Sequence, residues 1–308
     1  MNLLFFFILI FALRLSASSR TSKGTSFRLV NKCSHTVWPG LLSSAKSPPL
    51  PTTGFALKPD KSRTLTFPHS WSGRIWGRTH CSVNAAGKFS CLTGDCASGK
   101  VSCGGAGAIP PATLAEFTLN GTGGLDFYDV SLVDGYNLPI LVAPRGGHGG
   151  DCSPTGCLVD LNEGCPKELS VITTRGNASK SIKVGTAVAC RSACEAFGKP
   201  EYCCSEGFNT PDTCHPSVYS TLFKQACPRS YTYAYDDKTS TFTCASADYI
   251  IVFCPPPYTS NKLLGARRMA GELPLVNKTM MHLRSRGIKG NKASPGLSPG
   301  LAFPPFSC

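Results

Sequence analysis

The stretch that carries most information about the fold is Gly87-Lys88-Phe89-Ser90-Cys91-Leu92-Thr93-Gly94-Asp95-Cys96-Ala97-Ser98-Gly99-Lys100-Val101-Ser102-Cys103. Three cysteines lie within it, and the tripeptide Thr93-Gly94-Asp95 between two of them has the composition of a tight turn. A structural turn between crosslinks explains this composition better than a binding site does. Whether the crosslinks form depends on where the protein resides.

The N-terminus predicts export. Residues 3–13 are uniformly apolar, but this block is too short to span a bilayer, and the small residues Ser16-Ala17-Ser18 follow where signal peptidase cuts. We expect residues 1–19 to be a signal peptide, with an N-terminal membrane anchor as the alternative. Export would place the chain in an oxidising compartment.

The cysteine count fits a disulfide framework. Sixteen of the seventeen cysteines lie between Cys33 and Cys254, and Cys308 is the odd one in the tail. A zinc site is a weaker interpretation, because no paired histidines accompany the ligand-like cysteine spacings. Cys203 and Cys204 are neighbours and must bond to different partners, since a bridge between them would be strained. Sequence reasoning alone leaves the pairing open.

The positive charge is concentrated in the tail. Of the formal net charge of +13, the tail from Pro255 onward carries +7, which leaves only +5 for residues 20–254 once Arg14 is removed with the signal. A nucleic-acid-binding protein would carry its basic residues on the folded surface, so we expect no nucleic-acid partner. A mild attraction to anionic cell walls or membranes is compatible with this charge.

Short alternating segments separated by Gly, Pro and Ser clusters predict β-strands at residues 26–30, 62–67, 113–119, 127–133 and 247–253. Helical spacing is confined to residues 193–197 and 218–226, and in the second of these Tyr219, Leu222 and Phe223 are expected to pack in a core. The pattern is typical of a mainly β protein built as an antiparallel sandwich.

We expect the sandwich to comprise residues 27–151 and 228–254, with a cysteine-rich helical and loop insertion at residues 152–227. Residues 255–308 are rich in Pro, Gly, Ser and Lys and show neither periodicity, so we predict a disordered basic tail.

Several segments around residues 87–103 resemble one known family. The segments follow the family order and are Arg74-Ile75-Trp76-Gly77-Arg78-Thr79, Pro110-Pro111-Ala112-Thr113-Leu114-Ala115-Glu116-Phe117, Asp129-Val130-Ser131-Leu132-Val133-Asp134-Gly135-Tyr136-Asn137-Leu138-Pro139, Cys165-Pro166-Lys167-Glu168-Leu169, Glu201-Tyr202-Cys203-Cys204 and Ser240-Thr241-Phe242-Thr243-Cys244. Together with residues 87–103 they resemble the thaumatin-like, osmotin-type plant defence proteins over about residues 25–254.

This resemblance implies a specific disulfide pairing. The implied bridges are Cys33–Cys254, Cys81–Cys91, Cys96–Cys103, Cys152–Cys244, Cys157–Cys227, Cys165–Cys190, Cys194–Cys203 and Cys204–Cys214. Cys308 has no counterpart. The long basic tail also departs from the family, whose members commonly stop soon after the position of Cys254.

The candidate site is a group of acidic residues. No basic side chain lies between Lys100 and Arg145, while Glu116, Asp126, Asp129 and Asp134 fall in this window. A purely structural role is the alternative, because Asp134-Gly135 is also a good turn dipeptide and Asp129 could satisfy backbone donors. The resemblance implies that an interdomain cleft is lined by Arg74, Glu116, Asp129, Asp134 and Asp236, with Asp237 as an alternative to the last.

These residue types suit a neutral polysaccharide. Carboxylates accept hydrogen bonds from sugar hydroxyls, and Phe89, Tyr128 or Tyr136 would supply aromatic faces. Hydrolysis would require one protonated and one ionised carboxyl flanking the scissile bond. We assign these roles to Glu116 and Asp134. Asp129 and Asp236 would then shape the electrostatic field around this pair, and Arg74 would hold the ionised carboxylates in position.

The sequence therefore predicts a secreted plant defence protein that binds β-1,3-glucan or another polysaccharide of fungal cell walls, with weak endo-β-1,3-glucanase activity as an open question. The alternatives are a protein that permeabilises fungal membranes and an inhibitor of fungal glycanases. We expect a monomer without cofactor or metal, located in the apoplast or cell wall, or in the vacuole if the tail is a sorting propeptide. Asn177 and Asn120 begin the glycosylation sequons that we expect to be used; a third begins at Asn277.

Overall fold

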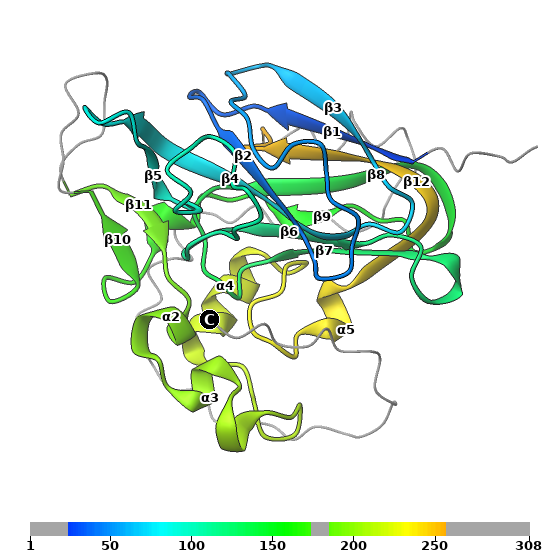
Figure 1. The fold of residues 1–308 in the computed structure, drawn as a ribbon. Helices are drawn as coiled ribbons and strands as arrows, with labels where there is room; N and C mark the ends of the chain where they lie inside the picture. Colours follow the sequence, from blue (N-terminus) through cyan, green and yellow to red (C-terminus); the bar gives the residue numbers. More distant parts are fainter. Residues whose placement is uncertain (1–23, 174–184, 257–308) are drawn as a thin grey trace, which may run out of the picture.

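The computed structural model describes residues 24–173 and 185–256, and its architecture is mainly β, as predicted (Figure 1). The strands are β1 (Thr25–Asn31), β2 (Trp38–Ser43), β3 (Ser62–Phe67), β4 (Ser72–Val83), β5 (Phe89–Thr93), β6 (Leu114–Thr118), β7 (Asp126–Ser131), β8 (Ile140–Gly150), β9 (Thr155–Cys157), β10 (Ser170–Ile172), β11 (Ala187–Cys190) and β12 (Phe242–Phe253). The helices are α2 (Ala193–Phe197), α3 (Pro200–Cys203), α4 (Val218–Ala226) and α5 (Asp237–Ser240), with 3-10 turns η1 (Thr122–Gly124), η2 (Leu161–Gly164) and η3 (Glu206–Phe208).

One curled sheet contains ten of these strands, in the order β2-β4-β6-β7-β12-β1-β3, with β5, β8 and β9 attached off this path. The long strand β12 joins these strands: β7 pairs with its first residues and β1 with its last residues along one edge, while β8 pairs with nearly its whole length along the opposite edge. Most pairs are antiparallel, but β1 runs parallel to β12. Strand β9 lies in the range predicted as insertion and pairs with β8 of this sheet.

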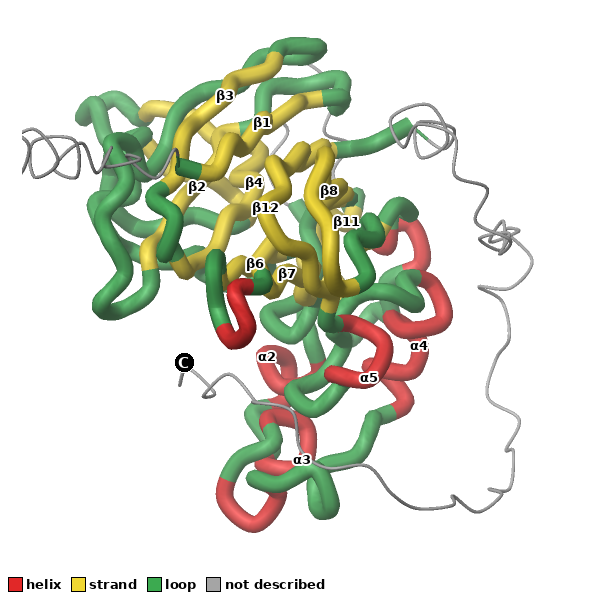
Figure 2. Tube along the Cα trace, turned by 90° about the vertical axis from the view of Figure 1, so that its right-hand side faces the viewer, coloured by secondary structure: helices red, strands yellow, loops and turns green. Residues whose placement is uncertain are grey.

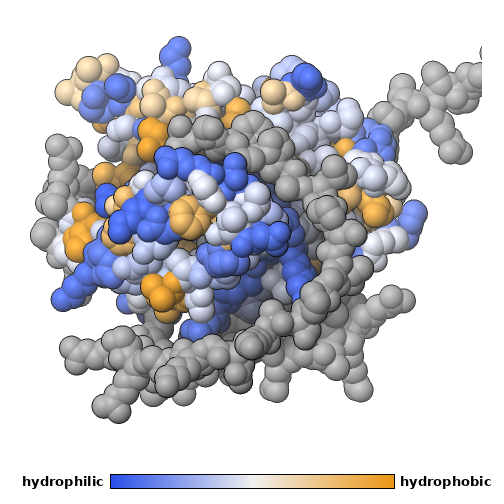
Figure 3. All heavy atoms as spheres, turned by 90° about the horizontal axis from the view of Figure 1, so that it is seen from below, coloured by the Kyte–Doolittle hydropathy of each residue, from blue (hydrophilic) through white to orange (hydrophobic). Residues whose placement is uncertain are grey.

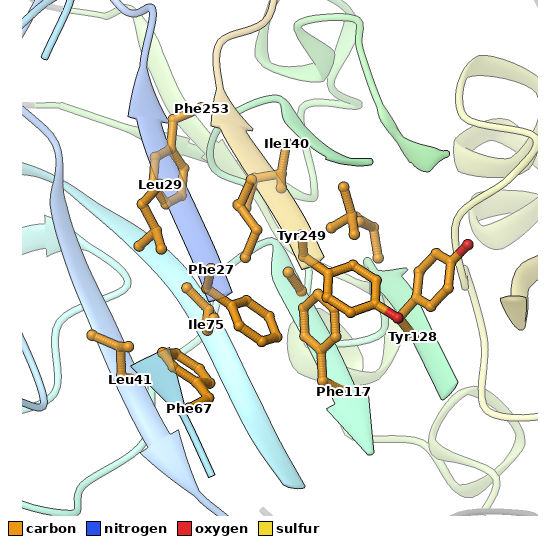
Figure 4. Close-up of a cluster of buried hydrophobic side chains, with 14 of the residues drawn as sticks. Phe27, Leu29, Leu41, Phe67, Ile75, Phe117, Tyr128, Ile140, Tyr249 and Phe253 are labelled. Carbon is orange, nitrogen blue, oxygen red and sulfur yellow. The ribbon is translucent and has the colours of Figure 1, made fainter. Parts of the chain in front are cut away.

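Aromatic side chains fill the space that the curled sheet encloses. Phe27 stacks on Phe67 with ring centroids 4.2 Å apart and meets Phe117 edge to face at 4.8 Å (Figure 4). Tyr249 completes this cluster, and its hydroxyl donates to Asp126 Oδ2 at 2.9 Å. Asp126 also accepts from a backbone N–H, so this member of the acidic window is a satisfied buried carboxylate of the core.

The helices gather at one end of the molecule, below the sheet (Figures 1 and 2). Helices α2 and α4 cover the ranges predicted from helical spacing. Phe223 is buried in a second hydrophobic core, and the half-buried Tyr219 packs against that core. Leu222 is also half-buried, but it does not belong to this core. The cysteine-rich segment therefore packs around a second, smaller core, to which Leu132 and Tyr136 also contribute.

A two-residue bridge joins the turn after β7 to the insertion. The backbones of Tyr136 and Cys190 exchange both hydrogen bonds at 2.8 Å. Gly135 makes this approach possible: its φ is +82°, and a Cβ at this position would lie 2.8 Å from the carbonyl oxygen of Cys190. Glycine is the residue that tolerates both conditions.

The disulfide pairing implied by the family resemblance is confirmed. The eight bridges are Cys33–Cys254, Cys81–Cys91, Cys96–Cys103, Cys152–Cys244, Cys157–Cys227, Cys165–Cys190, Cys194–Cys203 and Cys204–Cys214. The predicted signal peptide, the basic tail with Cys308, and the sequons at Asn177 and Asn277 lie outside the described residues. Asn120 is exposed beside the end of β6.

Among residues 24–173 and 185–256, no helix is long and apolar enough to cross a membrane.

Candidate functional site

Three of the predicted site residues form a row across neighbouring strands. Arg74 on β4 pairs with Glu116 on β6, and Glu116 pairs with Asp129 on β7. Residues directly opposite each other on adjacent strands project from the same face, with Cβ atoms about 4.5–5.5 Å apart. Their sequence neighbours Ile75, Ala115 and Val130 form the adjacent row on the core face. The alternation that buries the core therefore places the charged row on the opposite face.

Asp134 joins this row from the turn that follows β7. The backbone N–H of Gly135 closes the turn on the carbonyl of Leu132 at 3.0 Å. Arg74 then lies between two carboxylates: its Nε is 3.3 Å from Glu116 Oε1, and its Nη1 is 3.9 Å from Asp134 Oδ2. We call Arg74, Glu116, Asp129 and Asp134 the acidic cluster.

Burial and mutual repulsion make the carboxyls of the acidic cluster hard to ionise. Burial raises the pKa of Glu116, against the opposing effect of Arg74, and the charge of Asp134 raises it further. Burial likewise raises the pKa of Asp134, again opposed by Arg74. Both side chains still reach solvent, with 31% and 33% of their surfaces exposed. The pair can therefore meet a ligand and hold protons at a higher pH than ordinary carboxyls do.

Asp129 is the deepest of these groups. The residue is 4% exposed, and its Oδ1 is buried without a hydrogen-bond partner among the described residues. Burial raises its pKa well above the ordinary value, and the charge of Glu116 adds to this. The alternative considered for Asp129, that it caps backbone donors, therefore does not hold for Oδ1. A protonated Asp129 beside Glu116 avoids placing two negative charges in one buried pair.

The structure gives Asp236 and Asp237 different surroundings. Asp236 Oδ2 accepts from the backbone N–H and the hydroxyl of Thr232, both at 3.0 Å, and forms an ion pair with Lys224 at 2.9 Å. Its side chain is only 11% exposed, so it is engaged in local structure. Asp237 is exposed, and its charge contributes to the raised pKa of Asp129. Of the two, Asp237 is the one whose charge reaches the acidic cluster.

The prediction that Phe89, Tyr128 or Tyr136 offers a ring face to sugar is wrong. These side chains are 5%, 1% and 0% exposed. Tyr128 precedes Asp129 on β7, so the pleat turns its ring into the core when the carboxylate faces outward. The hydroxyls of Tyr128 and Tyr136 donate to the carbonyls of residues 153 and 159, at 2.6 and 2.9 Å. All three rings have structural roles.

The turn Thr93-Gly94-Asp95 is structural, as predicted. Trp76 Nε1 donates to the carbonyl of Gly94 at 2.8 Å, and Asp95 Oδ1 accepts from the backbone N–H of the next residue.

A solvent-open cavity that the sequence did not predict lies between the turn after β7 and the insertion. Its walls include Val133, the residues of α2 around Ala193, and the rings of Tyr202, Tyr219 and Tyr233. Seen from the insertion end, the visible surface is mostly hydrophilic, with apolar residues in separate spots (Figure 3). Val133 in this lining precedes Asp134 in the chain, but no residue of the acidic cluster is itself in the lining.

The comparisons with known proteins agree with this architecture. The sequence profile of the Thaumatin family matches residues 31–255. Thaumatin-like protein 1 of Arabidopsis thaliana is 56% identical over 241 residues, covering 76% of this chain and 87% of that protein. A pathogenesis-related thaumatin-like protein 3.5 of Cryptomeria japonica is 55% identical over 231 residues, covering 75% and 90%. A glucan endo-1,3-beta-glucosidase of Prunus avium is 54% identical over 226 residues, covering 73% and 88%.

The family profile covers well over half of the chain, and these relatives exceed half identity over most of their own length. The eight disulfides, which pair the cysteines as the resemblance implies, and the mainly β fold both agree with this assignment. The chain is a member of the thaumatin family.

Proposed function

We propose that this chain is a secreted plant defence protein that binds a neutral β-1,3-glucan of fungal cell walls at the acidic cluster. The observation that carries the proposal is Arg74 held between Glu116 and Asp134, all three partly exposed on one face of the sheet. Stability alone does not explain such a group, because a buried carboxyl whose pKa is raised on folding lowers the free energy of unfolding at neutral pH. The names of the relatives from Cryptomeria japonica and Prunus avium support defence and β-1,3-glucan respectively.

The chemistry of the cluster suits a polyhydroxylated ligand. Ionised carboxylates accept hydrogen bonds from sugar hydroxyls, and a protonated carboxyl can also donate. The guanidinium of Arg74 fixes the positions of Glu116 and Asp134, so little side-chain ordering is left to oppose binding. The buried aromatic residues cannot contribute. Half-buried rings line the cavity instead, among them Tyr202 and Tyr233.

Slow hydrolysis of the bound glucan is part of the same proposal. A glycosidase needs one carboxyl kept protonated to supply the leaving-group oxygen with a proton, and a second ionised as base or nucleophile. Glu116 has the acid's environment, since burial and the charge of Asp134 both raise its pKa. Asp134 would be the ionised partner, with Arg74 opposing its protonation.

Secretion is proposed on the eight bridges and the signal-like N-terminus. Disulfides in such number form in oxidising compartments and are uncommon in the cytosol.

The test is titration of a soluble β-1,3-linked glucose hexamer into the refolded protein, compared with the double variant Glu116→Gln/Asp134→Asn and the control Asp151→Asn. Asp151 is an exposed carboxylate. We expect the double variant to lose at least about tenfold in affinity, the loss of one or two hydrogen bonds to charged groups, while the control binds like the wild type. Vesicle leakage without any glucan binding, or tight inhibition of a xylanase instead, would reject the proposal for one of its alternatives.

A further inference from the structure

The bridge between Tyr136 and Cys190 joins the turn that carries Asp134 to the segment that leads into α2. Asp134 lies two residues before Tyr136, and α2 begins three residues after Cys190. Gly135 packs directly on the carbonyl of Cys190, so this contact fixes the turn that carries Asp134. Cys190 and Cys194 are both in disulfides, which hold the start of the helix in place.

Glu195 is the acidic residue of this helix. Ser192 caps α2, and its Oγ accepts from the backbone N–H of Glu195 at 3.2 Å, which fixes Glu195 in the first turn. Its Oε1 lies 3.5 Å from Arg191 Nε. Its Oε2 is buried and has no hydrogen-bond partner among the described residues. The side chain as a whole is 22% exposed, so a ligand can approach it.

The charges that face Glu195 come from both sides of the contact. Arg191 on its own segment favours the carboxylate, whereas the negative charge of Asp134, on the turn after β7, disfavours it. Burial is the largest cause, and together these effects raise the pKa of Glu195 to about 7. Arg74 acts on this arrangement through its contact with Asp134. Near neutral pH Glu195 is therefore easily protonated, and it lies within the electrostatic influence of Asp134, which is paired with arginine.

A small cavity lies beside these two segments, although neither Asp134 nor Glu195 is in its lining. Its lining includes Val133, which precedes Asp134, and Cys194, which precedes Glu195. A ligand that extends from the acidic cluster towards the insertion would therefore reach the segments that carry the two carboxyls.

We propose that Glu195 is a further ligand-contacting residue of this site, which binds a hydroxyl group of the polysaccharide as a neutral carboxylic acid, opposite Asp134. The inference rests on the proposed function and deepens it, because it makes sugar binding depend on one proton held by the insertion. A neutral Glu195 can donate and accept, and it spares the complex the cost of burying a second negative charge beside Asp134. Binding should therefore favour the protonated form, so affinity falls as pH rises through 7.

The first experiment measures the protonation of Glu195 without ligand. Carbon-13 NMR of the side-chain carboxyls gives its titration in the full chain and in Asp134→Asn. We expect a midpoint near 7 in the wild type and a lower midpoint in the variant, because the repelling charge is removed. Titration of Glu195 in the range of an ordinary exposed glutamate would overturn the inference whatever the protein binds.

The second experiment measures affinity for the soluble β-1,3-linked glucose hexamer between pH 6 and pH 8.5. Linkage to one proton limits the change to about tenfold per pH unit, and we expect a loss of about three- to tenfold for the wild type across this range. Glu195→Gln, whose amide mimics the neutral acid, should match the wild type at pH 6 and bind more tightly than it at pH 8.5. Glu163→Gln, at an exposed position, is the control and should follow the wild type.

The outcomes separate the two proposals. If the wild type binds the hexamer but Glu195→Gln keeps the same pH dependence, or weakens binding equally at every pH, the role of Glu195 is refuted and the glucan site remains. If the wild type does not bind the hexamer at any pH, the proposed function fails and the inference fails with it.

Discussion

At the scale of single residues, the most unusual group is the buried carboxyl of Asp129. Its Oδ1 is unpartnered, whereas the equally buried Asp126 on the same strand bonds to Tyr249 and to a backbone N–H. One strand thus carries a structural aspartate on its core face and an unsatisfied one on the face of the acidic cluster. The unsatisfied group is the one expected to serve function at some cost to stability.

Replacing Asp129 should therefore stabilise the protein. A carboxyl whose pKa is raised on folding weakens the native state as pH rises from its unfolded pKa towards its folded one. We expect Asp129→Asn to gain about 1–3 kcal/mol in the free energy of unfolding at pH 8, because the amide removes the cost of ionising a buried carboxyl, and much less at pH 4. Denaturant unfolding at the two pH values measures this. Asp126→Asn is the matched control and should lose stability, because it disturbs satisfied hydrogen bonds. Equal destabilisation by both variants would contradict the assignment.

Glu116→Gln and Asp134→Asn separate hydrolysis from binding. Both changes keep side-chain size and remove the titrating group. If the protein hydrolyses glucan, each should lower the rate of reducing-sugar release by about a hundredfold or more, as the loss of a general acid or base does, with binding changed only a few fold. Unchanged turnover in both variants would exclude this pair and direct attention to Asp129 and Glu195.

At the scale of elements, the sequence predicts best where one face is buried and spacing is regular. Strand β3 and helices α2 and α4 match their predicted ranges. The sequence pattern does not predict strand β4, because residues 75–79 are buried on both faces and its two glycines hide any alternation. Strand β8 is not predicted either, because it ends in a glycine-rich run that likewise hides any alternation. Glu116 could be assigned to the outer face from alternation alone, and the structure confirms it.

The contacts between elements could not be predicted in this way. Pairing Arg74 with Glu116 and Glu116 with Asp129 depends on register between strands, which no local pattern specifies. The position of Glu195 depends on the bridge between Tyr136 and Cys190. The Ser192-x-x-Glu195 spacing is a helix-start signal, and it could have placed Glu195 in the first turn of α2 but not opposite Asp134.

Gly135→Ala tests how the turn positions the site. A Cβ there would lie 2.7 Å from Pro111 Cβ and 2.8 Å from the Cys190 carbonyl, at a φ of +82°. We expect the free energy of unfolding to fall by several kcal/mol, from strain and overpacking together. We also expect weaker glucan binding, because Asp134 shifts. Gly198→Ala is the control: its φ is +62°, but nothing lies within 4 Å of the added Cβ. This variant should lose only about 1–2 kcal/mol in the free energy of unfolding and should bind the hexamer as the wild type does. Thermal unfolding and hexamer titration report both effects.

At the scale of the whole molecule, the disulfides divide by the length of chain they close. Cys33–Cys254 spans 221 residues and ties the end of β1 to the end of β12, whereas Cys96–Cys103 spans seven. Because these two strands already pair in register, the bridge reinforces an existing contact. Its main effect is on the unfolded chain, which it keeps compact.

Removing each bridge should show this difference. Replacing Cys33 and Cys254 together by Ala is expected to cost up to about 5 kcal/mol, and replacing Cys96 and Cys103 together should cost about half as much, because the loop entropy is smaller. Denaturant unfolding under non-reducing conditions compares the two variants. Equal losses would mean that local packing, and not loop closure, decides the contribution of these bridges.

Binding of β-1,3-glucan at the acidic cluster can be observed in crystals of the protein soaked with the β-1,3-linked glucose hexamer. We expect sugar hydroxyls within hydrogen-bonding distance of Glu116 and Asp134, with the oligosaccharide extending towards α2. Density for the hexamer on another surface, with the acidic cluster free of sugar, would contradict it.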